Sequence, residues 1–423
     1  MKTIDIAELI EHWMSRIETD EVLSSYAEGL NVGVTLKSDN HVFMYVKLTK
    51  NPSATSSPVE NSANKPDMDL TAPLKFWENL LRGTWEPGAH AFGASLSTNV
   101  GLIYSGEKYV QSISRAALER LLELARPPVT DEKWLFDPSV VVGHYADVST
   151  KSGKSSRIYY ETAGTDSSKT PVLFLHTAGA DSRQFHFQLA SPQINEERLL
   201  LSFDLPRHGK SLPVQGESPF IRKDLTPCEY VDWCVSFIES VCKKPVIIAG
   251  CSMGSMAALM VGAQRPDLIR GVIAIEAPDK SPERRSVELL SAKIDQMRFV
   301  PTYVRGLMNP SSPEAYRDLA TWIYSQGGFG TYEADVGFYS SGFDGNKLVT
   351  SYADSKIPIR LITGSYDYSA TPESSRKLQS LLPNSSFSEM NDLGHFPMIE
   401  NPQAFNRHLE KELAALDLQL MTG

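Results

Sequence analysis

The chain has 423 residues, which is too long for one average domain and predicts two or three folding units. Its apolar fraction of 41% and its charged fraction of 22% are ordinary for a globular protein. The net charge of −10 argues against a nucleic-acid-binding protein, because there is no surplus of basic side chains to neutralise phosphates.

The first residues contain no apolar core of the kind found in a signal peptide. No apolar run reaches the length of a membrane span, so we expect a cytoplasmic protein. The cysteines form no Cys-x-x-Cys pair and lack histidines at matching spacing, which predicts buried free thiols and no metal site. The four cysteines are Cys228, Cys234, Cys242 and Cys251.

Residues 1–130 are interpreted as a separate, small α+β domain. Apolar residues at helical spacing predict a helix over residues 4–17, and alternating residues predict strands between 30 and 48. Residues 51–73 are rich in Ser, Pro, Asn and Ala, which predicts a flexible surface insertion. The remaining predicted segments are a helix over 74–81, a strand over 92–104, a helix over 114–125 and a linker over 126–131.

One segment of this first unit resembles the sterol-carrier-protein family. It is Trp77-Glu-Asn-Leu-Leu-Arg-Gly83, followed by Pro87, Ala89 and Ala91. The resemblance implies a small domain with an apolar tunnel or a docking surface, and it brings no catalytic residues. A structural or dimerising domain, and with it a homo-oligomer, is the alternative interpretation.

Residues 131–423 alternate strands with helices, which predicts a mostly parallel, doubly wound sheet with helices on both faces. A hairpin over 140–148 and 156–162 is expected to open the unit. Thr226-Pro-Cys-Glu229 predicts the capped start of a helix. Continuous apolar runs predict strands that are buried on both faces. These runs are 171–176, 198–204, 245–250, 271–276 and 357–363, and a last strand is expected over 385–390.

Residues from about 278 to 352 interrupt this alternation with a long segment that is rich in aromatic side chains. An insertion of this length inside a βα repeat predicts a helical cap over the sheet. We expect most of its aromatic side chains to form the core of the cap itself.

The pentapeptide Gly250-Cys251-Ser252-Met253-Gly254 stands between a predicted buried strand and a predicted helix. Glycines are needed where a strand turns sharply into a helix, because a Cβ there would collide with the neighbouring elements. Ser252 is therefore predicted at the N-terminus of the helix, where free N–H groups favour a developing negative charge.

A serine hydroxyl is a poor nucleophile and needs a base, which in turn needs an orienting acid. His395 follows the predicted last strand and Asp367 follows the strand before it, so both are expected at the same edge of the sheet as Ser252. The order Ser252, Asp367, His395 is the nucleophile–acid–base order of one known fold. Glu276, at the end of another strand, is the second choice for the acid, and Asp392 is a further rival.

Three other histidines are rival candidates for the base. We expect His176 to order the loop after its strand and His208 to be a turn residue. His408 is expected within the last helix, which is predicted to start at Asn401-Pro402.

Four motifs in order make residues from about 140 to 420 resemble the α/β-hydrolase family with an inserted cap. They are His176-Thr-Ala-Gly179, Asp204-Leu-Pro-Arg-His-Gly-Lys-Ser211, Gly250-Cys-Ser-Met-Gly254 and Gly394-His395-Phe-Pro. The resemblance implies an oxyanion hole formed by the backbone N–H groups of Met253 and Ala178. The family usually has glycine where Thr177 stands, so the detailed geometry of the hole stays open. Arg207 likewise replaces a common glycine, on a surface turn.

The resemblance implies acyl transfer to water, with no metal and no organic cofactor. A hydrolase of carboxylic esters or lactones, acting on a small to medium, partly apolar molecule, is the first hypothesis. The second is a carbon–carbon bond hydrolase of diketones, although Cys251 and Phe396 stand where those enzymes usually have Asn and Trp. A binding protein that uses the cap as a ligand clamp without turnover is the third.

Overall fold

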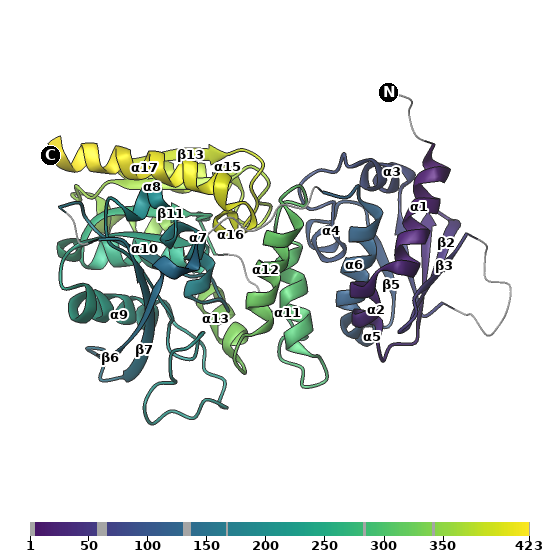
Figure 1. The fold of residues 1–423 in the computed structure, drawn as a ribbon, viewed down its shortest axis with the longest axis horizontal. Helices are drawn as coiled ribbons and strands as arrows, with labels where there is room; N and C mark the ends of the chain where they lie inside the picture. The colour runs from purple at the N-terminus through teal and green to yellow at the C-terminus, as the bar shows by residue number, and fades with distance from the viewer. Residues whose placement is uncertain are drawn as a thin grey trace. The chain divides into compact units, whose positions relative to one another are not determined.

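The computed structural model describes residues 5–56, 66–129, 137–165, 168–281, 285–340 and 343–422. It divides into two compact units (Figure 1). The first unit comprises Met1–Thr130 together with Ser291–Pro310, and the second comprises Asp131–Leu290 together with Ser311–Gly423.

The first unit contains a five-stranded sheet in the order β3-β2-β1-β4-β5. Its strands are β1 (Val32–Ser38), β2 (His41–Leu48), β3 (Ser53–Thr55), β4 (Met68–Ala72) and β5 (Ile103–Gly106). The central strand β1 pairs antiparallel with β2 and parallel with β4. The expected strands between residues 30 and 48 are therefore confirmed.

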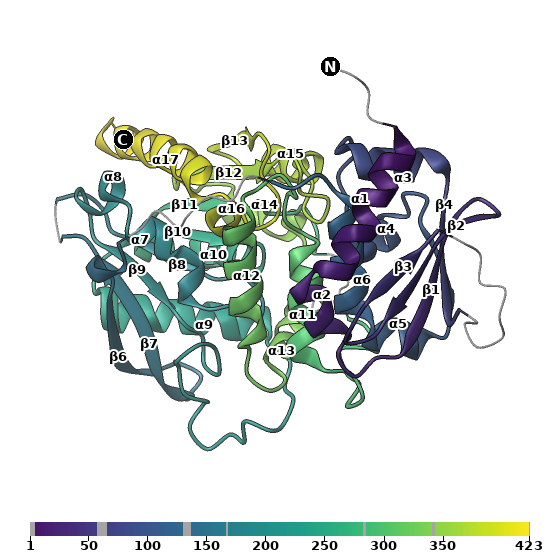
Figure 2. The same ribbon diagram turned by 45° about the vertical axis from the view of Figure 1, so that its right-hand side comes forward.

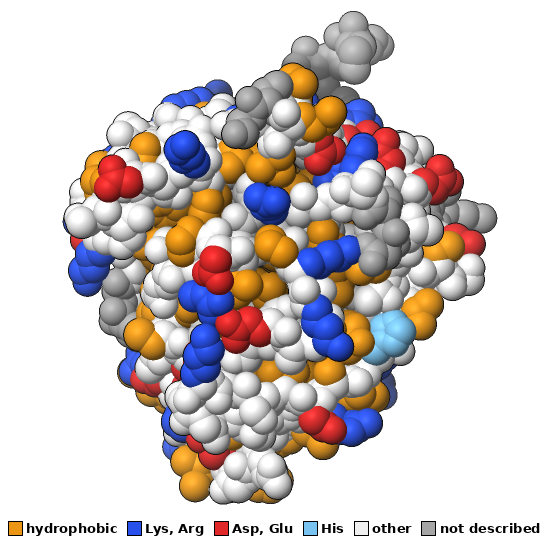
Figure 3. All heavy atoms as spheres, turned by 90° about the vertical axis from the view of Figure 1, so that its left-hand side faces the viewer, with side chains coloured by type: hydrophobic (Ala, Val, Ile, Leu, Met, Phe, Trp, Pro, Cys, Tyr) orange, Lys and Arg blue, Asp and Glu red, His pale blue; other side chains and the backbone are white. Residues whose placement is uncertain are grey.

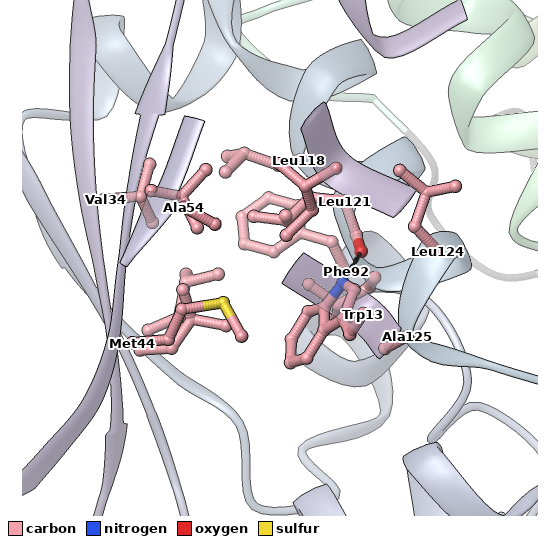
Figure 4. Close-up of a cluster of buried hydrophobic side chains, with 14 of the residues drawn as sticks. Trp13, Val34, Met44, Ala54, Phe92, Leu118, Leu121, Leu124 and Ala125 are labelled. Atoms are coloured by element: carbon pink, nitrogen blue, oxygen red, sulfur yellow. Dashed lines mark hydrogen bonds between the residues drawn. The ribbon is translucent and has the colours of Figure 1, made fainter. Parts of the chain in front are cut away.

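Helices cover this sheet and close an apolar core over it (Figure 4). They are α1 (Ile6–Thr19), α2 (Glu21–Ala27), α3 (Leu74–Arg82), α4 (Phe92–Thr98), α5 (Lys108–Ile113) and α6 (Arg115–Ala125). Inside the core, the indole Nε1 of Trp13 donates a hydrogen bond of 2.9 Å to the backbone oxygen of Leu121, which joins α1 to α6. The helices predicted near residues 4–17, 74–81 and 114–125 are confirmed.

The interpretation of residues 51–73 as a flexible surface insertion is wrong for β3 and β4. Strand β4 lies inside the sheet, between β1 and β5. Alternate side chains of β4 are buried, namely Met68, Leu70 and Ala72, so the segment has the pattern of a half-buried strand. Residues 57–65 of the predicted insertion lie outside the described residues.

The strand predicted over residues 92–104 is also wrong, because α4 occupies most of it. The Glu119 carboxylate accepts hydrogen bonds from the backbone N–H groups of Phe92 (2.8 Å) and Gly93 (2.7 Å) at the start of this helix. It satisfies donors that would otherwise be left without partners at a helix N-terminus. Asn99, with φ of +56°, ends the helix. A carboxylate from another helix thus supports α4, which local sequence could not indicate.

Residues 291–310 fall within the range predicted for the cap, yet they belong to the first unit. They carry helix α11 (Gln296–Arg305), which packs against α6. Arg305 Nε donates to Glu123 Oε2 at 2.9 Å, and Arg120 and Arg126 pair with the same carboxylate. The segment that the sequence predicts as a cap therefore contributes one helix to the first unit.

The second unit is built on an eight-stranded sheet in the order β13-β12-β11-β10-β8-β9-β7-β6. Strands β6 and β7 form the predicted antiparallel hairpin, β7 pairs antiparallel with β9, and the other pairs are parallel. The strands are β6 (Val142–Ser149), β7 (Ser155–Ala163), β8 (Val172–Leu175), β9 (Leu200–Phe203), β10 (Val246–Cys251), β11 (Ile269–Ile275), β12 (Ile359–Gly364) and β13 (Ser385–Met390). The mostly parallel, doubly wound fold is confirmed.

Helices lie on both faces of this sheet, with α17 and α9 on opposite sides in Figures 1 and 2. The Thr226 hydroxyl accepts from the Glu229 backbone N–H at 3.2 Å and caps α9, as the sequence predicts. The helices around the sheet are α7 (His186–Leu189), α8 (Pro192–Asn195), α9 (Pro227–Phe237), α10 (Met253–Gln264), α15 (Pro372–Leu381), α16 (Pro397–Glu400) and α17 (Pro402–Thr422).

Three further helices lie between β11 and β12, where the sequence predicts a cap. They are α12 (Glu314–Ser325), α13 (Thr331–Ser340) and α14 (Val349–Tyr352). Tyr324, Phe338, Tyr339 and Phe343 are buried, whereas Trp322 and Phe329 are exposed. Most of the aromatic side chains that this segment contributes to the second unit are therefore buried.

None of the helices in the described part of the chain combines the length and the apolar character that crossing a lipid bilayer requires. Figure 3 shows one face of the molecule, on which Lys and Arg side chains lie among Asp, Glu and apolar side chains. Charges of both signs are therefore mixed on that face.

Candidate active site

The turn between β10 and α10 places Ser252 in a strained backbone conformation, with φ of +52° and ψ of −115°. A Cβ on Gly250 would lie 2.2 Å from the backbone oxygen of Gly254, and a Cβ on Gly254 would lie 2.4 Å from that of Leu175. Both glycines are therefore required by close backbone approach. The sharp strand-to-helix turn predicted from the pentapeptide is present.

Ser252, His395 and Asp367 form one hydrogen-bonded chain. Ser252 Oγ lies 2.9 Å from His395 Nε2, and His395 Nδ1 lies 2.6 Å from Asp367 Oδ2. The three residues are only 2%, 1% and 2% exposed, respectively. Ser252 directly follows β10, while Asp367 and His395 follow β12 and β13, so the carboxyl ends of three parallel strands converge here.

The Asp367 carboxylate is held by the loop that carries it. Its Oδ1 accepts hydrogen bonds from the backbone N–H groups of Ser369 (2.7 Å) and Ala370 (3.0 Å). Burial alone would raise the pKa of Asp367, but His395 and the hydrogen bonds to the carboxylate outweigh burial and hold that pKa below its usual range. An ionised Asp367 accepts a hydrogen bond from the Nδ1–H of His395, which leaves Nε2 as the acceptor that faces Ser252.

Glu276, the second candidate for the acid, faces Asp367 rather than the imidazole. It is fully buried, and its carboxyl group accepts a hydrogen bond of 2.9 Å from the Gly364 backbone N–H. Burial, followed by the neighbouring Asp367 carboxylate, raises the pKa of Glu276 well above its ordinary value. Asp392 is exposed. Among the described residues, Asp367 is thus the carboxylate that contacts the His395 ring.

The rival histidines occupy other places. His176 Nδ1 donates to the backbone oxygen of Thr177 at 2.8 Å, and its Nε2 accepts from the Leu205 N–H at 3.2 Å. Burial and the nearby His208 lower the pKa of His176 to about 4, so this ring is neutral and orders the loop, as expected. His408 lies in α17, as predicted.

The prediction that His208 is simply a turn residue is incomplete. Its ring is buried, and Nε2 lies 2.7 Å from the Asp335 carboxylate, which comes from α13. The side chain of Arg207, at a turn with φ of +73°, donates to the backbone oxygens of Pro219 and Phe329. Both residues therefore bind other segments of the second unit.

Met253 and Ala178 lie on neighbouring elements beside Ser252. Met253 is the first residue of α10, and Ala178 is in the loop after β8, whose Leu175 pairs with Gly250 of β10. Neither backbone N–H has a hydrogen-bond acceptor among the described residues. Both N–H groups are therefore available to a substrate oxygen.

Sequence reasoning missed two tyrosines of the segment between β11 and β12. The Tyr339 hydroxyl lies 2.9 Å from Ser252 Oγ. The Tyr324 hydroxyl bonds to the Thr177 hydroxyl, and its ring packs edge-on against Phe396. No motif surrounds either tyrosine in the sequence, so only their aromatic character was visible.

One cysteine contacts the candidate site, because the Cys251 thiol donates a hydrogen bond of 3.4 Å to the backbone oxygen of His395. All four are free thiols, and Cys234 and Cys251 are buried, but Cys228 is exposed, so the prediction of buried thiols is wrong there. A residue near the start of a surface helix is reached by solvent whatever its apolar character. Within the described ranges, no group of three or more His, Cys, Asp or Glu side chains is arranged to hold a metal ion.

A family model described as the alpha/beta hydrolase family matches residues 172–408. The (E)-2-((N-methylformamido)methylene)succinate hydrolase of Acinetobacter baylyi is 32% identical over 71 residues, which is 17% of this chain and 24% of that protein. The match thus spans about a quarter of that relative's length.

Solved structures resemble the chain more extensively. The enol-lactonase of Burkholderia xenovorans is 18% identical with a TM-score of 0.54, over 66% of this chain and 100% of the other. A thermophilic esterase of Thermogutta terrifontis is 19% identical with a TM-score of 0.51, over 65% of this chain and 99% of the other. At such low identities these likenesses establish the fold alone.

Proposed function

Because the chain belongs to the alpha/beta hydrolase family, we propose that it is a serine hydrolase that cleaves a carboxylic ester or a lactone through an acyl-enzyme. The substrate is a small to medium, partly apolar molecule. The observation that carries the proposal is the buried hydrogen-bonded chain from Ser252 through His395 to Asp367. Ser252 Oγ lies at the distance from His395 Nε2 that proton transfer to a general base requires, and Asp367 lies at hydrogen-bonding distance from Nδ1.

In the proposed reaction, His395 Nε2 takes the proton of Ser252 as Oγ attacks the carbonyl carbon. The carbonyl oxygen becomes an oxyanion, and the imidazolium then protonates the leaving alkoxide as the carbon–oxygen bond breaks. Water repeats the cycle on the acyl-enzyme and releases the acid. Asp367 keeps the Nδ1 proton in place and stabilises the imidazolium without taking its proton.

The N–H groups of Met253 and Ala178 are proposed to hold the oxyanion. Preorganised donors of this kind typically contribute about 3–4 kcal/mol each to transition-state stabilisation. Their positions at the start of α10 and after β8 support this role, and neither N–H has a competing acceptor in the described chain. The N-terminus of α10 adds its helix dipole at the same point.

Tyr339 adds a hydroxyl to this site. Because Ser252 Oγ donates its proton to His395, the same oxygen accepts from the Tyr339 hydroxyl at 2.9 Å. As substrate enters, this phenol is released to donate to a substrate oxygen, while its ring supplies apolar surface. The aromatic side chains around it support a partly apolar substrate.

The named activities of the similar proteins also support an ester or lactone substrate. The two structures are an enol-lactonase and an esterase, and both cover about two thirds of this chain. The carbon–carbon bond hydrolase alternative gains less support, because Phe396 packs edge-on against the His395 ring at a centroid distance of 5.0 Å, where those enzymes usually place Trp. A protein that binds ligand without turnover is the remaining alternative.

The experiment that tests the proposal is the intact mass of the protein after exposure to a serine-directed fluorophosphonate, with Ser252→Ala as the control. We expect one adduct, which disappears in the variant. Panels of esters, lactones and diketones then separate the enzyme classes by the products formed. Absence of an adduct on the wild-type chain, together with ligand binding without turnover, would establish the binding protein instead.

A further inference from the structure

The loop after β8 presents three consecutive backbone N–H groups, those of Thr177, Ala178 and Gly179. The N–H of Thr177 donates to Gln184 Oε1 at 2.9 Å, and the N–H of Gly179 donates to Asp335 Oδ2 at 2.6 Å. The Ala178 N–H between them has no acceptor among the described residues. Two side chains therefore fix the outer peptides, while the middle donor stays available.

Two of the groups that fix this loop come from the cap helices α12 and α13. Asp335 lies on α13, and Tyr324 lies on α12. The Tyr324 hydroxyl bonds to the Thr177 hydroxyl and accepts from Gln184 Nε2 at 3.2 Å. Thr177 stands where the family usually has glycine, and its hydroxyl makes a contact with the cap that glycine lacks.

A buried ion pair holds the Asp335 carboxylate in place. Its Oδ2 accepts from His208 Nε2 at 2.7 Å, and His208 Nδ1 donates to the backbone oxygen of Pro206 at 3.0 Å. Because both ring nitrogens face acceptors, His208 is an imidazolium. Burial alone would lower the pKa of His208, but Asp335 outweighs burial and raises it.

Helix α13 also limits the shape of the loop. Gly179 has φ of +71°, and a Cβ at this position would lie 2.5 Å from the ring of Tyr332, which is on α13. The loop backbone therefore lies directly against the helix that supplies Asp335.

We propose that the cap assembles the oxyanion hole of this protein, with Asp335 and Tyr324 as positioning residues that hold the Ala178 N–H toward Ser252. The inference rests on the proposed function. Ser252 is 2% exposed, and the Tyr339 hydroxyl of α13 lies 2.9 Å from its Oγ. Substrate entry then requires the cap helices to move away from the loop, which breaks both contacts. The hole is then complete only when the cap is closed, which couples acylation to closure.

The test compares Asp335→Asn and Tyr324→Phe with the wild-type chain on an activated ester of a short fatty acid. We expect kcat to fall about ten- to a hundredfold while KM changes little, because the misplaced donor acts in the transition state. The affinity for a trifluoromethyl ketone, whose adduct with serine carries an oxyanion, should fall in step with kcat/KM. A purely structural role of Asp335 and Tyr324 would not lower the affinity for the ketone in proportion to kcat/KM.

Matched controls remove equivalent interactions elsewhere in the second unit. Asp417→Asn breaks the ion pair of Asp417 with Arg198, and Tyr352→Phe removes a hydroxyl that donates to the Leu259 backbone oxygen at 2.7 Å. Both should retain wild-type kcat and ketone affinity. Hydrogen exchange of the peptide over residues 172–185 should rise in Asp335→Asn and stay unchanged in the controls.

A second pair of variants, at Thr177, tests the inference even if Asp335→Asn fails to fold. Thr177→Ser retains the hydroxyl that meets Tyr324, so it should keep more activity than the isosteric Thr177→Val. If the variants of Asp335, Tyr324 and Thr177 all match the wild-type chain in kcat and ketone affinity while Ser252 still reacts with fluorophosphonate, the inference is overturned. If the wild-type Ser252 does not react with fluorophosphonate at all, the proposed function is overturned, and the inference that rests on it falls with it.

Discussion

Tyr339 and Ser252 share a hydrogen bond of 2.9 Å although 87 positions separate them in the chain. Tyr339 lies in the last turn of α13, and its backbone oxygen accepts a hydrogen bond of 2.8 Å from the Ser281 hydroxyl. Ser252, the proposed nucleophile, therefore contacts α13 as well as His395.

Tyr339→Phe should lower kcat by roughly tenfold or more, because the phenol donates to the reacting oxygens in the transition state. Steady-state kinetics on an ester measures this effect, and Tyr352→Phe is the matched loss of a buried hydroxyl. A rise in kcat/KM in Tyr339→Phe would show instead that the phenol only blocks the empty site.

The two buried carboxyl groups behind His395 should respond differently to amide substitution. Asp367→Asn should lower kcat by roughly two to four orders of magnitude, because the amide cannot hold the productive imidazole tautomer. Glu276→Gln should have a much smaller effect, since Glu276 contacts Asp367 and the Gly364 N–H. A severe loss in Glu276→Gln with a mild one in Asp367→Asn would reverse the assignment of the acid.

Glu276 should also make stability depend on pH. Its pKa in the folded state is raised well above its ordinary value, so folding takes up a proton at any pH between these two values. The contribution of Glu276 to the free energy of unfolding is fully present below its ordinary pKa. It is lost as pH rises toward the raised pKa, with a slope of up to about 1.4 kcal/mol per pH unit. Glu276→Gln should lack this slope.

Urea denaturation of both proteins between about pH 5 and pH 8 measures the difference. The free energy of unfolding of the wild-type chain should fall relative to that of Glu276→Gln as pH rises. Parallel curves for the two proteins would mean that Glu276 is ionised in the folded state.

Gly254→Ala should abolish stable folding or activity, because its Cβ would lie 2.4 Å from the Leu175 backbone oxygen of β8. Gly327→Ala is the matched control, since the nearest atom to its Cβ would be the backbone oxygen of Tyr324, at 3.5 Å. Thermal melting and fluorophosphonate labelling report on the two outcomes. An active, stable Gly254→Ala protein would contradict the backbone approach at the Ser252 turn.

The wrong predictions in the first unit have one cause: the structure of a short segment depends on contacts with residues that are distant in the sequence. Short apolar segments fit either a strand or a helix, and the Glu119 carboxylate that supports α4 at Phe92 lies 27 positions away. Strand β4 was hidden in a segment of turn-forming composition, although its alternate side chains are buried. The likeness of this unit to sterol carrier proteins stays a prediction.

Local patterns were enough to predict the parallel sheet and the candidate residues Ser252, Asp367 and His395, because continuous apolar runs and paired glycines have direct steric causes. The folded structure was needed to establish which carboxylate faces His395, that α11 belongs to the first unit, and that Tyr339 contacts Ser252 and Asp335 contacts the loop after β8. Those choices depend on contacts between residues far apart in the chain, and a cap without local motifs carries no signal of where its side chains pack.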